Sequence, residues 1–315
     1  MGFFASLINS MPSAVAQGLI WGIMAIGVYL TYRILDVADL TVDGSLGTGG
    51  AVCVVMVLNG VPVGLALLAA TAAGMLAGLV TGLFHTACGI PAILAGILTQ
   101  LALYSVNLRI MGTGTGGGKA NLPISVDKYN LLVSARYVRN VALNNPILIL
   151  VIFCAVLIAV LYWFFGTELG CSLRATGANQ NMARAQGINT NVTKVLGLMI
   201  SNGLVALAGG LLAQYQGFSD INMGRGAIVI GLAAVIIGEV IFSRIFRNFA
   251  LKLLSAVIGA IIYYIVMVFV LRLGLSTDDL KLLTALVVAL FLTIPYWKGK
   301  YFTKTSVKKG EKNHA

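Results

Sequence analysis

The most constraining feature of this chain is a series of long apolar stretches without a charged residue. A helix needs roughly 20 such residues to cross the hydrocarbon core of a membrane. The purest stretches are Pro12–Tyr32, Ala51–Phe84, Gly89–Leu108, Pro146–Gly166 and Val195–Ser219. Three less pure stretches follow, namely Ala227–Phe242 with Glu239, Leu251–Leu271 with Lys252, and Leu282–Trp297.

The stretch Ala51–Phe84 is too long for one crossing, and Asn59-Gly60-Val61-Pro62 interrupts it. Counted as two spans, it brings the expected total to about nine crossings. With 59% hydrophobic and 10% charged residues, the chain cannot be a water-soluble domain. The sequence therefore predicts an all-α, multi-spanning membrane protein in which residues 1–315 form one transmembrane domain.

Cysteine and histidine are scattered along the chain. The four cysteines form no CxxC pair, and His85 and His314 are too few and too far apart to make a ligand set. We therefore expect neither a metal site nor a redox centre.

The net charge of +11 reflects membrane topology. The basic residues lie between apolar spans and in the tail 298–315, not on one face with aromatic residues, so we expect no nucleic-acid partner. The positive-inside rule places the tail in the cytoplasm. Counting spans back from the tail puts Thr167–Lys194 inside and the N-terminus outside. Four basic residues run against this count, because it leaves their loop outside: Lys119, Lys128, Arg136 and Arg139.

Two glycine-rich segments with acidic residues adjoin apolar runs, namely Asp39–Gly50 and Asp220–Gly226. Irregular backbone at membrane depth is tolerated only where it is buried in protein or faces water. By the span count the two segments run in opposite directions, as two inverted-topology repeats would. Ordinary aqueous loops at helix ends are the alternative.

The segment Thr167–Lys194 is the longest polar connection between two spans. Ser172–Ala175 predicts one helical turn ended by Gly177, and Asn179–Gln186 predicts a second short helix stopped by Gly187. The segment has neither a catalytic Ser/His/Asp set nor a phosphate-binding loop. It is either an interfacial connector or a docking element for a cytosolic partner.

The residues from Leu173 to Asn179, followed by Ala183, Ala185 and Gly187–Asn189, resemble the coupling-helix region of ABC importer permeases of the branched-chain amino acid and ribose superfamily. Four further segments are similar to permeases of tryptophan and tyrosine importers: Asp39–Ser45, Ala95–Thr99, Leu103–Gly112 and Ile237–Ile241. The resemblance runs from about Gln17 to Pro295.

This resemblance implies a type II importer fold in a prokaryotic plasma membrane, transporting by alternating access and without enzymatic activity of its own. The implied partners are cytosolic ATPases, which bind ATP and Mg²⁺, an extracytoplasmic solute-binding protein and a second permease copy in a homodimer. We expect no cofactor in this chain. The implied ATPase-coupling residues are Leu173, Arg174, Ala175, Thr176, Gly177, Asn179, Ala183, Gly187, Ile188 and Asn189.

Polar residues inside apolar spans are candidates for the transport pathway, because each costs free energy in lipid and tends to face protein or water. Hydrogen bonding between helices is the alternative for Asn202 and Gln214, and a salt bridge with Arg244 or Arg247 is the alternative for Glu239. The full candidate set is Asp43, Ser45, Thr48, Gln100, Asn107, Asn202, Gln214 and Glu239.

An amino acid, most simply an aromatic one, is the solute that the resemblance implies. The mostly neutral candidates suit a zwitterion or a neutral polar solute, so a sugar or nucleoside stays open. A proton-coupled secondary transporter using Glu239, or a channel, would be a different class of protein. The coupling-region resemblance argues against both.

Overall fold

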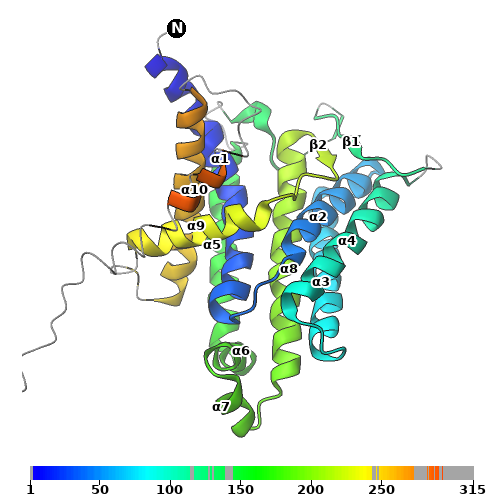
Figure 1. Ribbon diagram of the computed structural model, residues 1–315. Helices are drawn as coiled ribbons and strands as arrows, with labels where there is room; N and C mark the ends of the chain where they lie inside the picture. Colours follow the sequence, from blue (N-terminus) through cyan, green and yellow to red (C-terminus); the bar gives the residue numbers. More distant parts are fainter. Residues whose placement is uncertain are drawn as a thin grey trace, which may run out of the picture.

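The computed structural model describes residues 3–113, 117–126, 128–129, 131–138, 145–242, 246, 248–272, 282, 284–286, 288–290 and 293. This part of the chain is mainly helical (Figure 1). In chain order its elements are α1 (Phe3–Tyr29), the π-helix η1 (Leu30–Ile34), α2 (Thr41–Leu58), α3 (Val63–Thr86), α4 (Ala92–Met111), β1 (Asn121–Pro123), the 3-10 helix η2 (Ala135–Tyr137), α5 (Pro146–Gly166), α6 (Glu168–Ala178), α7 (Gln180–Ala185), α8 (Thr190–Gln216), β2 (Phe218–Asp220), α9 (Ala227–Phe242) and α10 (Phe249–Arg272).

Seven helices in the described part are long and apolar enough to cross a membrane. They are α1 continued by η1, α2, α3, α4, α5, α8 and α10, while α9 is apolar but has only 16 residues. The predicted break at Asn59–Pro62 is confirmed, because α2 ends at Leu58 and α3 begins at Val63. Half of the residues of the last expected span, Leu282–Trp297, lie outside the described residues, so the total of about nine crossings stays approximate.

Helix α2 begins at Thr41, inside the segment that the sequence predicted to be irregular. That prediction is wrong for Thr41–Gly50, because the glycines there serve close helix packing. A Cβ at Gly49 would lie only 2.6 Å from the Cα of Ala206 on α8. Small residues let two membrane helices approach to backbone contact.

Irregular backbone is found in or beside each of the two glycine-rich segments. The connection 35–40 between η1 and α2 contains Asp36, whose φ of +54° is uncommon for a residue with a side chain. The turns that follow β2 end at Gly226, with a φ of +85°, and lead directly into α9. The second predicted irregular segment is therefore confirmed from Ile221 to Gly226, whereas Asp220 ends β2.

The helices α6 and α7 lie at one end of the molecule, and the N-terminus and the β1–β2 pair lie at the other (Figure 1). The strands are antiparallel, with Leu122 opposite Ser219. Helix α9 runs across the bundle from β2 (Figure 1). At the α6 end, the ring of Phe249 at the start of α10 meets that of Phe165, with centroids 5.0 Å apart. The segment Thr167–Lys194 and the start of α1 thus lie at opposite ends, as the span count requires. Lys119, whose charge runs against that count, lies two residues before β1.

Helix α8 is the centre of the bundle and packs against α1, α2 and α3. Glycines make these contacts close. A Cβ at Gly78 of α3 would lie 2.7 Å from the carbonyl carbon of Leu198, and one at Gly209 of α8 would lie 2.9 Å from that of Leu46.

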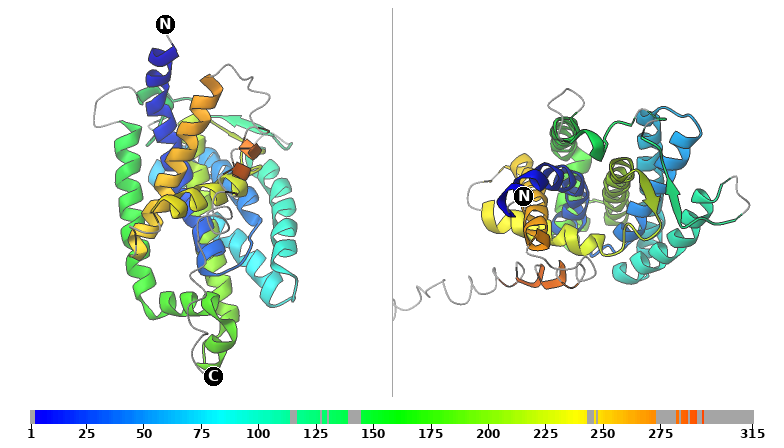
Figure 2. Two further views of the ribbon diagram at one scale, coloured as in Figure 1. Left: turned by 60° about the vertical axis from the view of Figure 1, so that its left-hand side comes forward. Right: turned by 90° about the horizontal axis from the view of Figure 1, so that it is seen from above.

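Helix α5 stands at one edge of the bundle (Figure 2). Only 17% of its most apolar stretch is buried, compared with 78% for α8. Its outer face carries exposed aliphatic residues, which suits contact with lipid: Leu148, Val151, Ile152, Val156 and Val160.

Candidate functional site

The polar connector between α5 and α8 folds into α6 and α7. Thr167, Asn179 and Asn189 directly precede α6, α7 and α8, and each side-chain oxygen accepts a hydrogen bond from an N–H of the following turn. Such caps satisfy N–H groups that have no partner inside the helix. Gly187, with a φ of +81°, follows α7 as predicted. The connector is thus a defined structure, not a loose loop.

Gly177 does not end a helix, contrary to the sequence prediction, because α6 continues to Ala178. The direction changes instead at Asn179, whose φ is −160°. A glycine is needed at position 177 because α6 contacts the end of the first span closely there. A Cβ at Gly177 would overlap the carbonyl oxygen of Ile34 in η1 and would lie 3.0 Å from the Cα of Leu35.

One face of α6 docks on the bundle. Leu173 is buried, and its side chain and that of Leu35 both lie over Gly197 of α8. The hydroxyl groups of Thr176 and Thr193 are 2.9 Å apart and share a hydrogen bond. Helix α6 therefore touches the end of the first span and α8 at the same time.

The opposite face of the connector is open. Arg174 is exposed, but its side chain turns back toward α5, where its Nη2 donates a hydrogen bond to the carbonyl of Phe165 at 2.7 Å. Leu169 and Met182 add exposed apolar surface. Of the other predicted coupling residues, Ala175, Asn179, Gly187 and Asn189 are exposed, Gly177 and Ile188 are half-buried, and Leu173, Thr176 and Ala183 are buried.

A buried chain of polar side chains joins the connection 35–40 to α2 and α8. The Nδ2 of Asn202 donates to Asp39 at 2.6 Å, and the Oγ of Ser45 donates to the Oδ1 of Asn202 at 2.7 Å. Asp39 also accepts a hydrogen bond from the N–H of Thr41 at 2.9 Å.

Sequence reasoning chose Ser45 and Asn202 but treated Asp39 only as part of a segment. It also missed a threonine cluster that joins α2, α3 and α4. The hydroxyl groups of Thr41 and Thr81 are 2.7 Å apart, and that of Thr81 donates to Thr99 at 2.9 Å. Threonines in apolar runs give no signal by spacing, whereas the position of Asp39 at the start of a span could have identified it.

Asp43 brings the two glycine-rich segments together. Its carboxylate accepts hydrogen bonds from the N–H of Gly226 at 3.0 Å and from that of Ile228 at 2.9 Å. A negative group at this position also suits the positive end of the helix dipole. Although it belongs to α2, Asp43 caps the start of α9.

Thr48 and Gln214 make hydrogen bonds within the chain. The hydroxyl of Thr48 donates to the carbonyl of Gly44 at 3.0 Å. Gln214 donates to the sulfur of Cys53 and accepts from the N–H of Leu132, both at 3.2 Å. Gln214 thereby ties the segment between α4 and α5 to the bundle.

Two candidates on α4 retain hydrogen-bonding capacity. The Oδ1 of buried Asn107 has no partner in the described structure, and its Nδ2 is 3.5 Å from the carbonyl of Gly44. Gln100 is half-buried, and no hydrogen bond of its side chain is found among the described residues. Both residues lie against α2. A Cβ at Gly44 would lie 3.2 Å from the Cα of Gln100, and a Cβ at Gly47 would lie 3.2 Å from the Nδ2 of Asn107.

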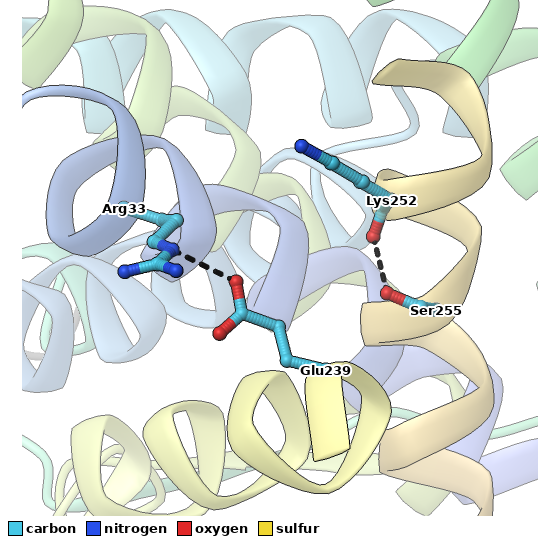
Figure 3. A network of polar contacts seen from close by, with 4 residues as sticks. All are labelled: Arg33, Glu239, Lys252 and Ser255. Atoms are coloured by element: carbon cyan, nitrogen blue, oxygen red, sulfur yellow. Dashed lines mark hydrogen bonds and ion pairs between the residues drawn. The ribbon is translucent and has the colours of Figure 1, made fainter. Parts of the chain in front are cut away.

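Glu239 of α9 forms an ion pair with Arg33 of η1, with 2.9 Å between Oε1 and Nε (Figure 3). The salt bridge weighed from the sequence exists, but its partner comes from the first span. Arg244 and Arg247 lie outside the described residues.

The described part of the chain contains no cluster of three or more His, Cys, Asp or Glu residues that could hold a metal ion.

Comparison with known proteins agrees with this architecture. The profile of the family described as branched-chain amino acid transport system / permease component matches residues 10–294. The chain is 41% identical over 284 residues to the tyrosine transport system permease protein of Clostridioides difficile (strain R20291), covering 90% of each chain. It is 28% identical to the ribose import permease protein RbsC of Escherichia coli (strain K12), covering 73% of this chain and 69% of that one.

A solved structure, PsaBC from Streptococcus pneumoniae in complex with Fab, matches with a TM-score of 0.53. The match covers 95% of this chain and 98% of that chain, at 16% identity. At this identity the likeness concerns the fold alone, and it supports the multi-spanning helical architecture.

Proposed function

Since the chain belongs to the family of branched-chain amino acid transport system permease components, we propose that it moves an aromatic amino acid, with tyrosine as the first candidate. The protein is the membrane-spanning permease subunit of an ABC importer. The observation that supports this choice of substrate is the 41% identity to a tyrosine transport permease over 90% of both chains.

Such an importer works with an ATPase and a solute-binding protein. In our proposal two copies of this chain form a homodimer, with the pathway on its two-fold axis, in the plasma membrane of a prokaryote. Cytosolic ATPases, which bind ATP and Mg²⁺, dock on the connector Thr167–Lys194. The binding protein docks at the end that carries β1 and β2, and the basic tail 298–315 is cytoplasmic.

We assign Gln100 and Asn107 to the pathway, because they face one side of α4 and retain polar groups for a passing solute. Ser45 and Asn202 are buried and satisfy each other, which favours a structural role. A neutral lining of this kind suits a zwitterion, since a strongly charged solute would need compensating charge. The amide groups of α4 thus fit the proposed class of solute.

The contacts of α6 suggest how a movement caused by ATP binding is transmitted to the pathway. A push on the connector acts on η1 at Ile34 and on α8 at Thr193. From η1 the connection 35–40 leads to Asp39, which is bonded to Asn202 in the middle of α8. Movement of the ATPases would therefore shift the first span relative to α8 and change the access of the pathway.

A sugar is the second candidate solute, because the ribose import permease is also a relative. Its 28% identity over 73% of the chain makes it the weaker guide. Proton coupling through Glu239 is disfavoured by the ion pair with Arg33.

The experiment is calorimetry on the partner binding protein with tyrosine, tryptophan, leucine, ribose and a nucleoside, followed by ATP-driven uptake in proteoliposomes. We expect tight binding of tyrosine or tryptophan, and uptake of the same solute only when the ATPase and ATP are present. Tight binding of ribose or a nucleoside with no response to any amino acid would refute the substrate and leave the permease role unaffected. A matched liposome without the permease serves as the control.

A further inference from the structure

A cavity of about 780 Å³ lies at the α6 end of the molecule. Its walls come from the end of the first span, the end of α5, the second half of α6 and the start of α10. It is therefore separate from the α4 face proposed for the solute.

Three basic residues from three different elements line this cavity, namely Arg33 of η1, Arg174 of α6 and Lys252 of α10. Within the described part of the chain, Arg33 alone of the three is paired with a carboxylate, that of Glu239. The guanidinium of Arg174 is bonded to a backbone carbonyl and lies 5.9 Å from the ring centre of Phe249. These pairings leave two positive charges without an acidic partner among the described residues.

Lys252 is the most informative of the three. It lies inside the span Phe249–Leu271, where a free ammonium group in lipid is costly. Its side chain is exposed, and Figure 3 draws no contact to its ammonium group. A lysine near the end of a span is stabilised when its ammonium reaches an anionic headgroup.

The rim of the cavity is aromatic and borders the lipid-facing helix. Trp163 and Tyr162, at the end of α5, are 71% and 49% exposed. Such side chains gather at the level of membrane headgroups. Toward the middle of α5, Val160 and Val156 continue its exposed aliphatic face. A molecule with an anionic head and an apolar tail would contact the basic residues and this aliphatic face together, whereas an acidic segment of a protein would use the basic residues only.

We propose that this cavity binds an anionic phospholipid, with its phosphate among Arg33, Arg174 and Lys252 and its acyl chains along α5. Its place in the cytoplasmic leaflet rests on the orientation given in the proposed function. The binding itself does not depend on transport.

The test is native mass spectrometry on the full-length chain in a neutral detergent. The chain is titrated with phosphatidylglycerol, with phosphatidylcholine of the same acyl chains, and with glycerol phosphate as a headgroup without tails. We expect phosphatidylglycerol to bind several-fold more tightly than phosphatidylcholine, and glycerol phosphate not to displace it at equal concentration.

The variant Lys252→Gln should weaken phosphatidylglycerol binding about fivefold, which corresponds to one basic residue at a membrane surface. Phosphatidylcholine binding should not change. Lys119→Gln is the matched control, because it removes the same charge at the other end of the molecule and should leave both affinities unchanged.

Equal affinities for the two lipids, or the same loss in both variants, would refute the site. If glycerol phosphate at equal concentration displaces phosphatidylglycerol, the ligand of the cavity is a soluble anion and the lipid proposal is refuted. Release of all bound phosphatidylglycerol when the partner ATPase is added would assign the cavity to the ATPase interface and refute the proposal. Failure of lipid binding alongside normal uptake would leave the proposed function intact.

Discussion

Replacing Gly177 by alanine tests whether α6 must touch the first span. The added Cβ would lie 2.7 Å from the carbonyl carbon of Ile34 and 3.0 Å from the Cα of Leu35. Non-bonded carbon atoms attract best at about 3.5–4.0 Å, so α6 would have to move by at least about 0.8 Å. The obstructing atoms belong to the backbone and cannot rotate away. The movement therefore falls on the contacts of Leu173 and Thr176 with α8.

Overpacking of a close contact costs about 1–3 kcal/mol. At about 2–4 °C for each kcal/mol, the melting temperature in detergent should fall by several degrees. The functional effect should be larger. Coupling between two sites typically amounts to about 1–3 kcal/mol, or 5–150-fold, so its loss should lower solute-stimulated ATP hydrolysis by the reconstituted complex about fivefold or more. Basal hydrolysis by the ATPase should persist.

Gly166→Ala is the matched control, because a Cβ there meets no atom within 4 Å. It adds the same methyl group beside the same connector and should change neither melting nor coupling. Gly177→Val should be more severe than Gly177→Ala. If Gly177→Ala melts and couples like the unmodified chain, α6 does not act through η1 and the proposed route is refuted.

Three other substitutions test single contacts. Asp43→Asn should lower stability by about 1–3 kcal/mol, because an N–H at the start of α9 loses its acceptor; thermal unfolding checks this against Asp36→Asn, which changes an exposed residue. Asn202→Asp places a second carboxylate beside a buried one and should sharply reduce the yield of folded protein, whereas Asn191→Asp at the exposed start of α8 should not. Glu239→Gln should keep ATP-driven uptake within about twofold, since partly exposed ion pairs contribute about 0–1 kcal/mol. Uptake abolished together with its pH dependence would instead support proton coupling.

Hydropathy gave the most accurate bounds for the helices that are apolar on every side. The predicted stretches Pro146–Gly166 and Ala227–Phe242 coincide with α5 and α9. The start of α2 was missed, because the glycines between Thr41 and Gly50 suggest loose backbone when read alone. Only the positions of α4 and α8 show that Gly44, Gly47 and Gly49 each meet another helix.

The polar contacts were less predictable than the helices. The sequence indicated that Asn202 and Glu239 need partners, since each lies in an apolar run. It could not indicate Asp39 and Arg33 as those partners, because both come from a distant part of the chain. Hydrogen-bond partners across a bundle depend on how the helices are rotated, and hydropathy carries little information about rotation.

The glycines along α8 also limit how this protein can change shape. Where backbones touch, as at Gly78 beside Leu198 and at Gly209 beside Leu46, neither helix can turn about its own axis without collision. The interlocked helices α2, α3 and α8 must therefore travel as one rigid body. Large changes in backbone angle then fall on the links at the edge of that body, of which the connection 35–40, with its left-handed Asp36, is the nearest to α6. Spin labels on α3 and α8 should keep a constant separation throughout the ATP cycle, while the distance from either label to α6 changes.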